Sequence, residues 1–205
     1  MSYQGQIWVP PVNTNFTNLN SPYVQTVGNN IAMSIISTTN LLAGQYTSAP
    51  STPYCITANI VQNPGDYLAG AYSQITIGSG MGFYDGTKLV VLMIEWNTSD
   101  TMAMNVYECS SVSSLTSVWG QRITSGYPTS MLNWIQIRDD GTNIIFSVAT
   151  DAGPNSPSNW QYVYQQNRTS FLSNVNYVFW GGFGNNTINE TYGYFTLNSW
   201  QTTLL

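Results

Sequence analysis

The sequence predicts an all-β fold in which one domain, residues 1–205, forms a two-sheet antiparallel sandwich or jelly roll. Apolar and polar residues alternate in short segments such as 54–61 and 134–138, which is the pattern of a strand with one buried face. Turn-forming combinations of Gly, Pro, Asn and Asp recur roughly every 8–12 residues. No heptad repeat and no long helical period interrupts this pattern. Because 42% of the residues are apolar, the chain can fill a sizeable core.

The strands are expected at short, separate positions along the chain. Residues 1–25 form an N-terminal arm that leads into a first strand near Phe16, and residues 40–53 are expected to be a loop. Gly78-Ser79-Gly80 is expected to break one strand from the next, and the serine-rich segment 110–117 is expected to be a helical turn or a loop. The remaining expected strands are 31–36, 54–61, 72–77, 81–84, 89–96 (buried on both faces or near the centre of the sandwich), 102–108, 119–123, 134–138, 144–148, 160–164, 175–183 and 191–200.

The clearest element is a hairpin in the middle of the chain. Its first strand, 134–138, alternates, and Asp139-Asp140-Gly141-Thr142 supplies carboxylates and a glycine that suit a turn. In the second strand Ile144, Phe146 and Val148 point to one side. A loop rich in Gly, Pro, Asn and Ser, residues 152–159, then leads to a third strand that begins at Trp160.

These residues also carry a resemblance to a known family. The segments WIQIR (134–138), DDGTN (139–143) and RTSFL (168–172) are similar to motifs of concanavalin A-like (laminin-G-like) jelly-roll domains, in particular those of bacteriophage virion proteins. Two features depart from the family pattern: Gln136 replaces an Arg, and a short turn is expanded into residues 151–159. The resemblance implies the jelly-roll fold, neighbouring first and last strands, packing roles for the tryptophans of the hairpin region, and a place on a virion.

The charge composition excludes several classes of function. Only 6% of the residues are charged, with four Lys and Arg against nine Asp and Glu, so the net charge is −5. A chain with four scattered cations cannot neutralise a nucleic-acid backbone, so we expect no nucleic-acid partner. The longest apolar run, 89–94, is far shorter than the ~20 residues of a membrane helix, so no membrane insertion is expected. No basic or apolar leader is apparent at the start, which favours assembly in a host cytoplasm.

The polar surface must consist mainly of Asn, Ser, Thr and Gln. Such a neutral surface gives little charge repulsion between molecules, which suits a protein packed among neighbours. The alternative is a soluble protein whose hydroxyls and amides alone keep it in solution.

Residues that could hold a metal or a nucleophile are scarce. The chain contains no histidine, which excludes imidazole metal sites and Ser-His or Cys-His pairs, and no cofactor is expected. Cys55 and Cys109 are expected to be buried free thiols. The acidic turn at 139–141 is predicted to be a hairpin turn rather than a calcium site. Arg138 and Arg168 are each expected to bond a buried loop carboxylate or a backbone carbonyl.

A protein of this kind could act on carbohydrates either by hydrolysing a glycan or by binding one. Relatives of this fold that hydrolyse glycans place carboxylates on alternate residues of one strand, but none of Glu95, Glu108 and Glu190 has a carboxylate two residues on. Glu95 is expected in a turn or at the surface, so no catalytic residue is assigned. Trp96 and Trp119 are the candidate ligand-binding residues, because each aromatic ring neighbours amide or hydroxyl side chains of the kind that bind sugars.

We therefore predict a non-enzymatic phage virion surface protein with a lectin-like fold, either a capsid decoration or a tail-fibre component. A carbohydrate-binding adhesin for host-cell glycans is the alternative, and a glycanase is the third hypothesis. The expected partners are other virion proteins, host-surface glycans and further copies of the same chain on the particle.

Overall fold

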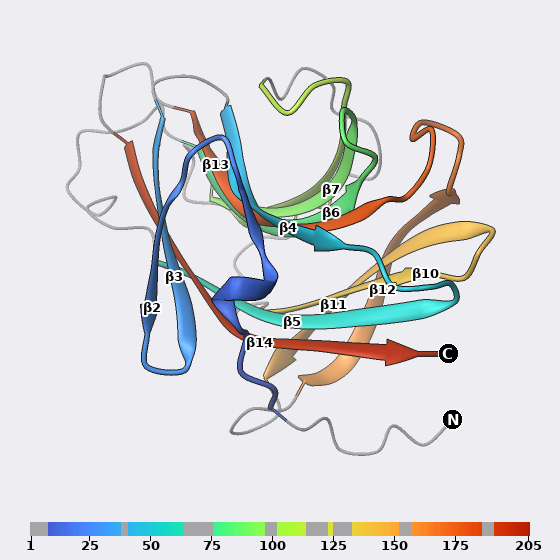
Figure 1. The fold of residues 1–205 in the computed structure, drawn as a ribbon, viewed down its shortest axis with the longest axis horizontal. Helices are drawn as coiled ribbons and strands as arrows, with labels where there is room; N and C mark the ends of the chain where they lie inside the picture. Colours follow the sequence, from blue (N-terminus) through green and yellow to red (C-terminus); the bar gives the residue numbers. More distant parts are fainter. Residues whose placement is uncertain are drawn as a thin grey trace.

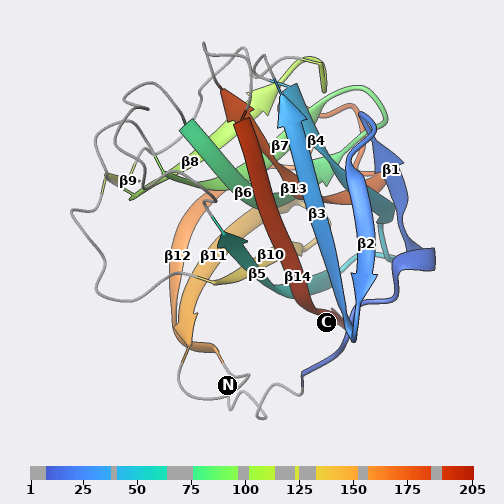
Figure 2. The same cartoon turned by 90° about the vertical axis from the view of Figure 1, so that its left-hand side faces the viewer.

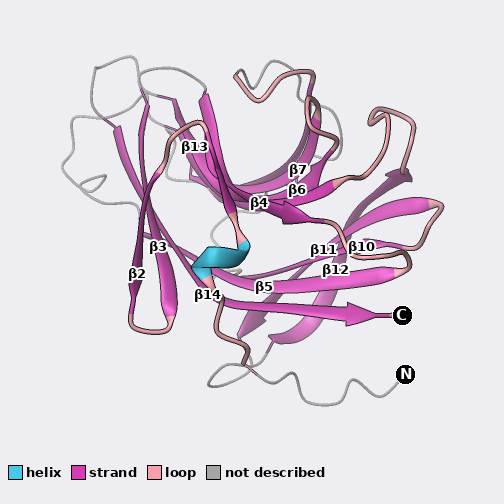
Figure 3. Cartoon of the chain, in the orientation of Figure 1, coloured by secondary structure: helices cyan, strands magenta, loops and turns pink. Residues whose placement is uncertain are grey.

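Two antiparallel sheets of seven strands each pack face to face in the computed structural model (Figure 1). The structure describes residues 8–37, 41–63, 76–96, 102–113, 123–124, 133–151, 157–185 and 191–205. The predicted all-β sandwich is thus confirmed. Within the described residues the only helix is η1 (Asn13–Asn15), a single 3-10 turn drawn in cyan in Figure 3. None of these residues forms a helix with the length and hydropathy that a membrane span requires.

The two sheets, called the front sheet and the back sheet, are defined by their strands. The front sheet has the order β1 (Thr17–Leu19), β4 (Leu41–Ser48), β13 (Tyr177–Asn185), β6 (Thr76–Tyr84), β7 (Leu89–Trp96), β8 (Met102–Cys109) and β9 (Ile123–Thr124). The back sheet has the order β12 (Pro157–Asn167), β11 (Asn143–Asp151), β10 (Trp134–Asp139), β5 (Tyr54–Asn63), β14 (Thr191–Leu204), β3 (Asn30–Ser37) and β2 (Tyr23–Val27).

Apolar side chains are buried on both faces of the front sheet. In β7, Val90, Leu92 and Ile94 belong to the inner core between the sheets. Leu89, Val91 and Met93 alternate with them and belong to a second cluster on the opposite face, called the outer core below. This alternation explains the continuous apolar run of residues 89–94 and confirms the prediction that the strand is buried on both faces. Both cysteines are buried and free, as expected.

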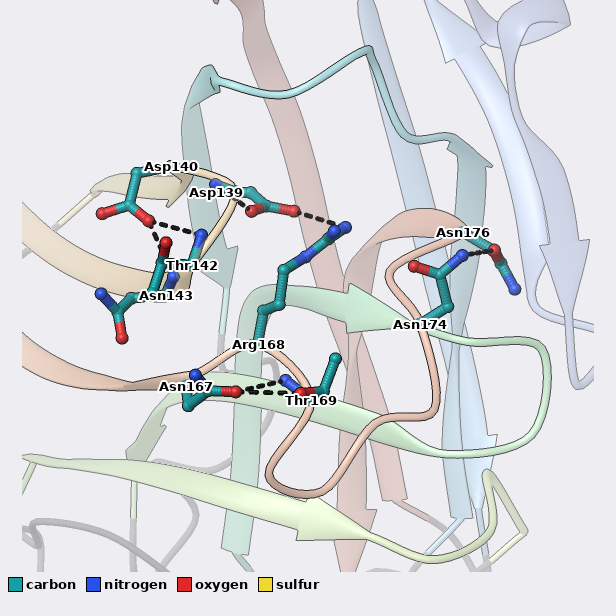
Figure 4. Close-up of polar contacts among 10 residues, drawn as sticks. Asp139, Asp140, Thr142, Asn143, Asn167, Arg168, Thr169, Asn174 and Asn176 are labelled. Carbon is teal, nitrogen blue, oxygen red and sulfur yellow. Dashed lines mark hydrogen bonds and ion pairs between the residues drawn. The ribbon is translucent and has the colours of Figure 1, made fainter.

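The central hairpin forms as predicted, and Figure 4 shows the polar contacts of its turn. β10 pairs with β11 in register, and Ile144, Phe146 and Val148 are all fully buried. In the turn, Asp140 Oδ1 accepts hydrogen bonds from the backbone N–H groups of Thr142 and Asn143 at 2.9 and 2.7 Å. These two bonds, the one from Asn143 first, lower the pKa of the Asp140 carboxyl below its ordinary value of 3.8.

A buried ion pair fixes the hairpin to the following loop. Arg168 Nη2 lies 3.0 Å from Oδ2 of Asp139, whose side chain is 0% exposed. The prediction that Arg168 bonds a buried carboxylate is therefore confirmed. Arg138 instead is exposed, and no ion pair joins it to another described residue.

The expected loop at residues 40–53 is wrong, because residues 41–48 form strand β4. Its mixed composition, LLAGQYTS, has no clear alternation of apolar and polar residues and gives a weak strand signal. The strand is nevertheless held between β1 and β13, where Leu42 belongs to the outer core and Ala43 to the inner core. Burial on two faces therefore outweighs the low local propensity.

The expected break at Gly78-Ser79-Gly80 is also wrong, since β6 runs without interruption from Thr76 to Tyr84. A side chain on Gly80 would collide with the backbone oxygen of Leu92 in the neighbouring strand. The glycine thus permits close approach of two backbones within the sheet rather than ending a strand.

The arm at residues 1–25 contains more structure than expected, because β1 and most of β2 lie in it. Phe16 does contact the last strand, with its ring 5.1 Å from that of Trp200 at an interplanar angle of 89°. However, Thr17 pairs with Tyr46 of β4, and β14 lies inside the back sheet between β5 and β3, as Figure 2 shows. The predicted contact between Phe16 and the last strand is therefore confirmed, but β1 and β14 lie in different sheets and do not pair through backbone hydrogen bonds.

The other boundaries differ by a few residues. β12 begins at Pro157, so the end of the expected loop at 152–159 belongs to a strand, and β14 extends to Leu204. The expected strand at 72–77 is described only from Thr76, and that at 119–123 only at Ile123. Residues 152–156 and 114–117 of the two expected loops lie outside the described residues.

Candidate functional site

The outer face of the front sheet, which points away from the back sheet, is concave (Figure 1). Strand pairing shows which residues share this face. One row across five strands contains Gly44, Gly181, Gly80, Met93 and Asn105. Three of the strands therefore contribute a glycine to this row, and the row ends at the polar side chain of Asn105.

Both flanking rows contain aromatic residues. Phe183, Gly78 and Glu95 lie in one of them, and Tyr46, Phe179, Gly82, Val91 and Tyr107 in the other. A side chain on Gly44 would lie 2.5 Å from the ring of Phe179, and one on Gly78 would lie 2.5 Å from the ring of Phe183. The glycines thus leave room for the two phenylalanine rings to lie against the sheet.

The rings on this face are packed rather than open to solvent. Phe179 is 0% exposed and Phe183 is 4% exposed, and both belong to the outer core. Tyr107 lies 6.0 Å from Phe183 in an edge-to-face arrangement. In its described part, the concave face is therefore a second packed core and not an open cleft for a polysaccharide.

A buried polar cluster stands at one side of this core. Asn105 Nδ2 donates to Glu95 Oε2 at 2.7 Å and, at 3.4 Å, to the hydroxyl oxygen of Tyr107. Glu95 is 4% exposed, Asn105 6% and Tyr107 8%. Burial, followed by the charge of Glu95, raises the pKa of Tyr107 above its ordinary value. The expectation that Glu95 lies in a turn or at the surface is wrong, because strand pairing carries it onto the packed face.

The second strand carboxylate of this region cannot join the first. Glu108 pairs with Val90, a residue of the inner core, and so lies on the opposite face of the front sheet from Glu95. Hydrolysis of a glycosidic bond by two carboxylates requires both of them in one binding site, ~5–10 Å apart, and therefore on the same face of the sheet. Among the described strand residues of the front sheet, Glu95 is the only carboxylate on the concave face.

The sequence-predicted ligand residues are not tested by this geometry. Trp96 is the last residue of β7, where its backbone pairs with Ile77 and Met102, and its side chain lies outside what the structure describes. Trp119 lies outside the described residues altogether. Of the two tryptophans expected to pack, Trp134 is 1% exposed and Trp160 is half-buried.

Sequence reasoning missed the cluster of Glu95, Asn105 and Tyr107. The available signal was the alternation of β8, in which Asn105 and Tyr107 share one face. Within the described chain, no group of three or more His, Cys, Asp or Glu side chains could hold a metal ion.

Comparison with known proteins shows similarity of structure and none of sequence. No family model and no curated protein matches the chain. A functionally unknown protein from Saccharomyces cerevisiae is similar in structure, with a TM-score of 0.61 and 14% identity over 94% of this chain and 97% of that one. A legume lectin-like domain from Entamoeba histolytica has a TM-score of 0.56 and 7% identity over 94% and 91% of the two chains.

A third similar structure comes from a virus of bacteria. The CBM2 module of the evolved Dit of Lactobacillus casei BL23 phage J-1 has a TM-score of 0.51 and 10% identity, and the match covers 92% of each chain. At these identities the similarities establish the fold. The chain therefore has the two-sheet sandwich of legume lectin-like proteins.

Proposed function

We propose that the protein is a non-enzymatic surface component of a bacteriophage particle, placed on the capsid or at a tail fibre, whose lectin-like sandwich recognises a glycan. The observation that carries the non-enzymatic part is the closed concave face, with Glu95 as its one described strand carboxylate. A carboxylate without a second one on the same face lacks the acid and nucleophile pair of most glycosidases.

The described surface supports a role in broad contacts with neighbouring proteins. Strand β12, an edge of the back sheet, has no charged residue along its eleven positions, and its Tyr162 is 62% exposed. Strand β2, the opposite edge, is also uncharged, with Tyr23 62% exposed. Edges without charge favour association through hydrogen bonds and apolar contact. We therefore expect attachment to the particle to resist salt, because screening acts on charge pairs.

The glycan part of the proposal is supported by the fold and by composition. Two of the similar structures are described as a legume lectin-like domain and a CBM2 module. In addition, 14% of this chain is aromatic, which supplies rings for stacking against sugars. The adhesin is the second candidate function, and it differs by having glycan recognition as its main task.

The test uses purified particles and the isolated protein. Antibody labelling in the electron microscope should place the protein on the particle exterior, and occupancy should be equal at about 0.1 M and 1 M NaCl. Particles that lose the protein at high salt, or that never carry it, would overturn the virion role.

A separate assay addresses catalysis. Incubation with neutral and acidic polysaccharides should release no reducing ends, and both Glu95→Gln and its matched control Glu108→Gln should leave polysaccharide binding intact. Hydrolysis that Glu95→Gln abolishes and Glu108→Gln preserves would show that the protein is an enzyme.

A further inference from the structure

A cavity of about 430 Å³ lies at the end of the sandwich where the N-terminal segment crosses from one sheet to the other. The segment is fixed to the last strand, because Val9 N donates to Ser199 Oγ at 3.2 Å and Trp200 N donates to Val9 O at 2.9 Å. The lining comes from this segment, from β4 and the residues after it, and from β5 and β14: Val9, Pro10, Pro11, Val12, Asn15, Phe16, Thr47, Ser48, Pro50, Ile56, Trp200 and Thr202. The volume is within the range of small-molecule sites, ~300–1,000 Å³.

A bulge in β14 is what turns Trp200 and Thr202 toward the cavity. Leu197 pairs with Ile60 and Ser199 with Asn59, so Asn198 is an extra residue in the ladder. After it, Trp200 and Thr202 pair with Ala58 and Ile56, which face the inner core. Without the extra residue these two side chains would lie on the outer face of the back sheet.

The walls combine aromatic rings with unused hydrogen-bonding groups. Phe16 and Trp200 pack edge to face, and both are half-buried, so each keeps part of its ring accessible. Asn15, Thr47 and Thr202 also line the cavity, and their side chains make no hydrogen bond within the described part of the chain. Each therefore has donors and acceptors available to a ligand.

None of the described residues that line the cavity is charged. An anionic or cationic ligand would lose its hydration there without gaining a counter-charge. A purely apolar ligand would leave the amide and the hydroxyls unpaired. A ligand that combines an apolar ring face with neutral hydroxyls meets both conditions, and that is the chemistry of an uncharged pyranose sugar.

We propose that this cavity binds one or two uncharged sugar units of a glycan, with Phe16 and Trp200 against the sugar ring and Asn15, Thr47 and Thr202 bonding its hydroxyls. The inference rests on the glycan recognition proposed above and assigns it to this place in the fold. Pro10, Pro11 and Pro50 restrict the backbone of the walls, so the site is formed before the ligand binds.

The test fills the cavity without disturbing the core. Thr202 is exposed and lines the cavity, whereas Thr203 is exposed on the opposite face of the same strand, where it pairs with Cys55. Thr202→Trp is the blocking variant, Thr203→Trp is its matched control, and Thr47→Trp blocks the cavity from β4, where Thr47 pairs with Val178 of the inner core. Thermal unfolding of all three confirms that each is folded.

The probes are glucose, galactose, mannose, N-acetylglucosamine, rhamnose and their disaccharides, with glucuronate and sialic acid as charged comparisons. Binding is measured by ligand-observed NMR and calorimetry. We expect at least one neutral sugar to bind, and we expect Thr202→Trp and Thr47→Trp to weaken that binding by about tenfold or more. Thr203→Trp should leave the dissociation constant within about twofold.

Three outcomes would contradict the proposal, and they differ in what they overturn. Neutral-sugar binding that survives both Thr202→Trp and Thr47→Trp would remove the cavity as the site while leaving glycan recognition standing. Binding of the charged sugars in preference to the neutral ones would refute the uncharged class. Absence of binding to the whole panel would overturn glycan recognition itself, independently of the location on the particle.

Discussion

Replacing Phe179 with alanine tests whether the concave face of the front sheet is a packed core. The Phe179 side chain is 0% exposed, and its ring lies against Gly44 and Gly181. Removal of a buried phenylalanine ring typically costs ~3–5 kcal/mol of unfolding free energy. Because the glycines beneath the ring have no side chains that could move into the gap, we expect a loss of about 4 kcal/mol.

For a chain of this size, ~2–4 °C of melting temperature corresponds to 1 kcal/mol, so Phe179→Ala should lower the melting temperature by about 8–16 °C. The assay is thermal unfolding followed by circular dichroism, with urea unfolding for the free energy. Tyr162→Ala is the matched control, because Tyr162 is 62% exposed and its loss should cost no more than ~0.5 kcal/mol.

The reasoning would be refuted by equal melting temperatures in the two variants. That result would mean that Phe179 is accessible in solution, as expected of an aromatic residue in an open sugar-binding cleft. The closed concave face, and with it the structural argument against a glycanase, would then be lost.

Three further predictions concern buried or hydrogen-bonded polar groups. Arg168→Gln should cost about 3 kcal/mol in urea unfolding, because it leaves the carboxylate of Asp139 buried without its cation, whereas Arg138→Gln, at an exposed position, should change stability by less than ~0.5 kcal/mol. Burial raises the pKa values of the two cysteine thiols to about 11 and about 12, so neither should react with a thiol reagent at pH 8 until the protein is unfolded; stoichiometric labelling of the native protein would contradict this. The folded pKa of Asp140 lies below its ordinary 3.8, so its contribution to stability is present above that pH and is lost as the pH falls through the folded pKa; the melting temperature of Asp140→Asn should therefore fall less between pH 6 and pH 2.5 than that of the parent.

The parts of the fold that are visible in the sequence are those set by local patterns. The hairpin at residues 134–151 could be predicted because alternation and an Asp-Gly turn are properties of a few adjacent residues. The burial of 89–94 could be predicted because only a strand covered on both faces is apolar at every position. The ion pair of Arg168 could be predicted only in kind, since the identity of its partner depends on how two turns meet.

What the sequence did not reveal depends on contacts between distant segments. Strand 41–48 has a loop-like composition and is a strand because β1 and β13 lie on either side of it. Gly78 and Gly80 resemble a break, and their roles become clear only when the ring of Phe183 lies beside Gly78 and the backbone of Leu92 beside Gly80. Glu95 was assigned to a turn or the surface because nothing local indicates that it is buried beside Asn105, which donates a hydrogen bond to it from the neighbouring strand.

The amino-acid sequence by itself determined the class of this protein: an all-β sandwich with few charged residues and no histidine, indicated by a period of two residues and turns at short intervals. The tertiary structure alone decided where chemistry is possible. It placed Glu95 and Glu108 on opposite faces of one sheet, and through the extra residue Asn198 it turned Trp200 into a cavity with Phe16. The physical reason is that a strand side chain has only two possible faces, and the choice between them is made by register with a neighbouring strand that can lie far away in the sequence.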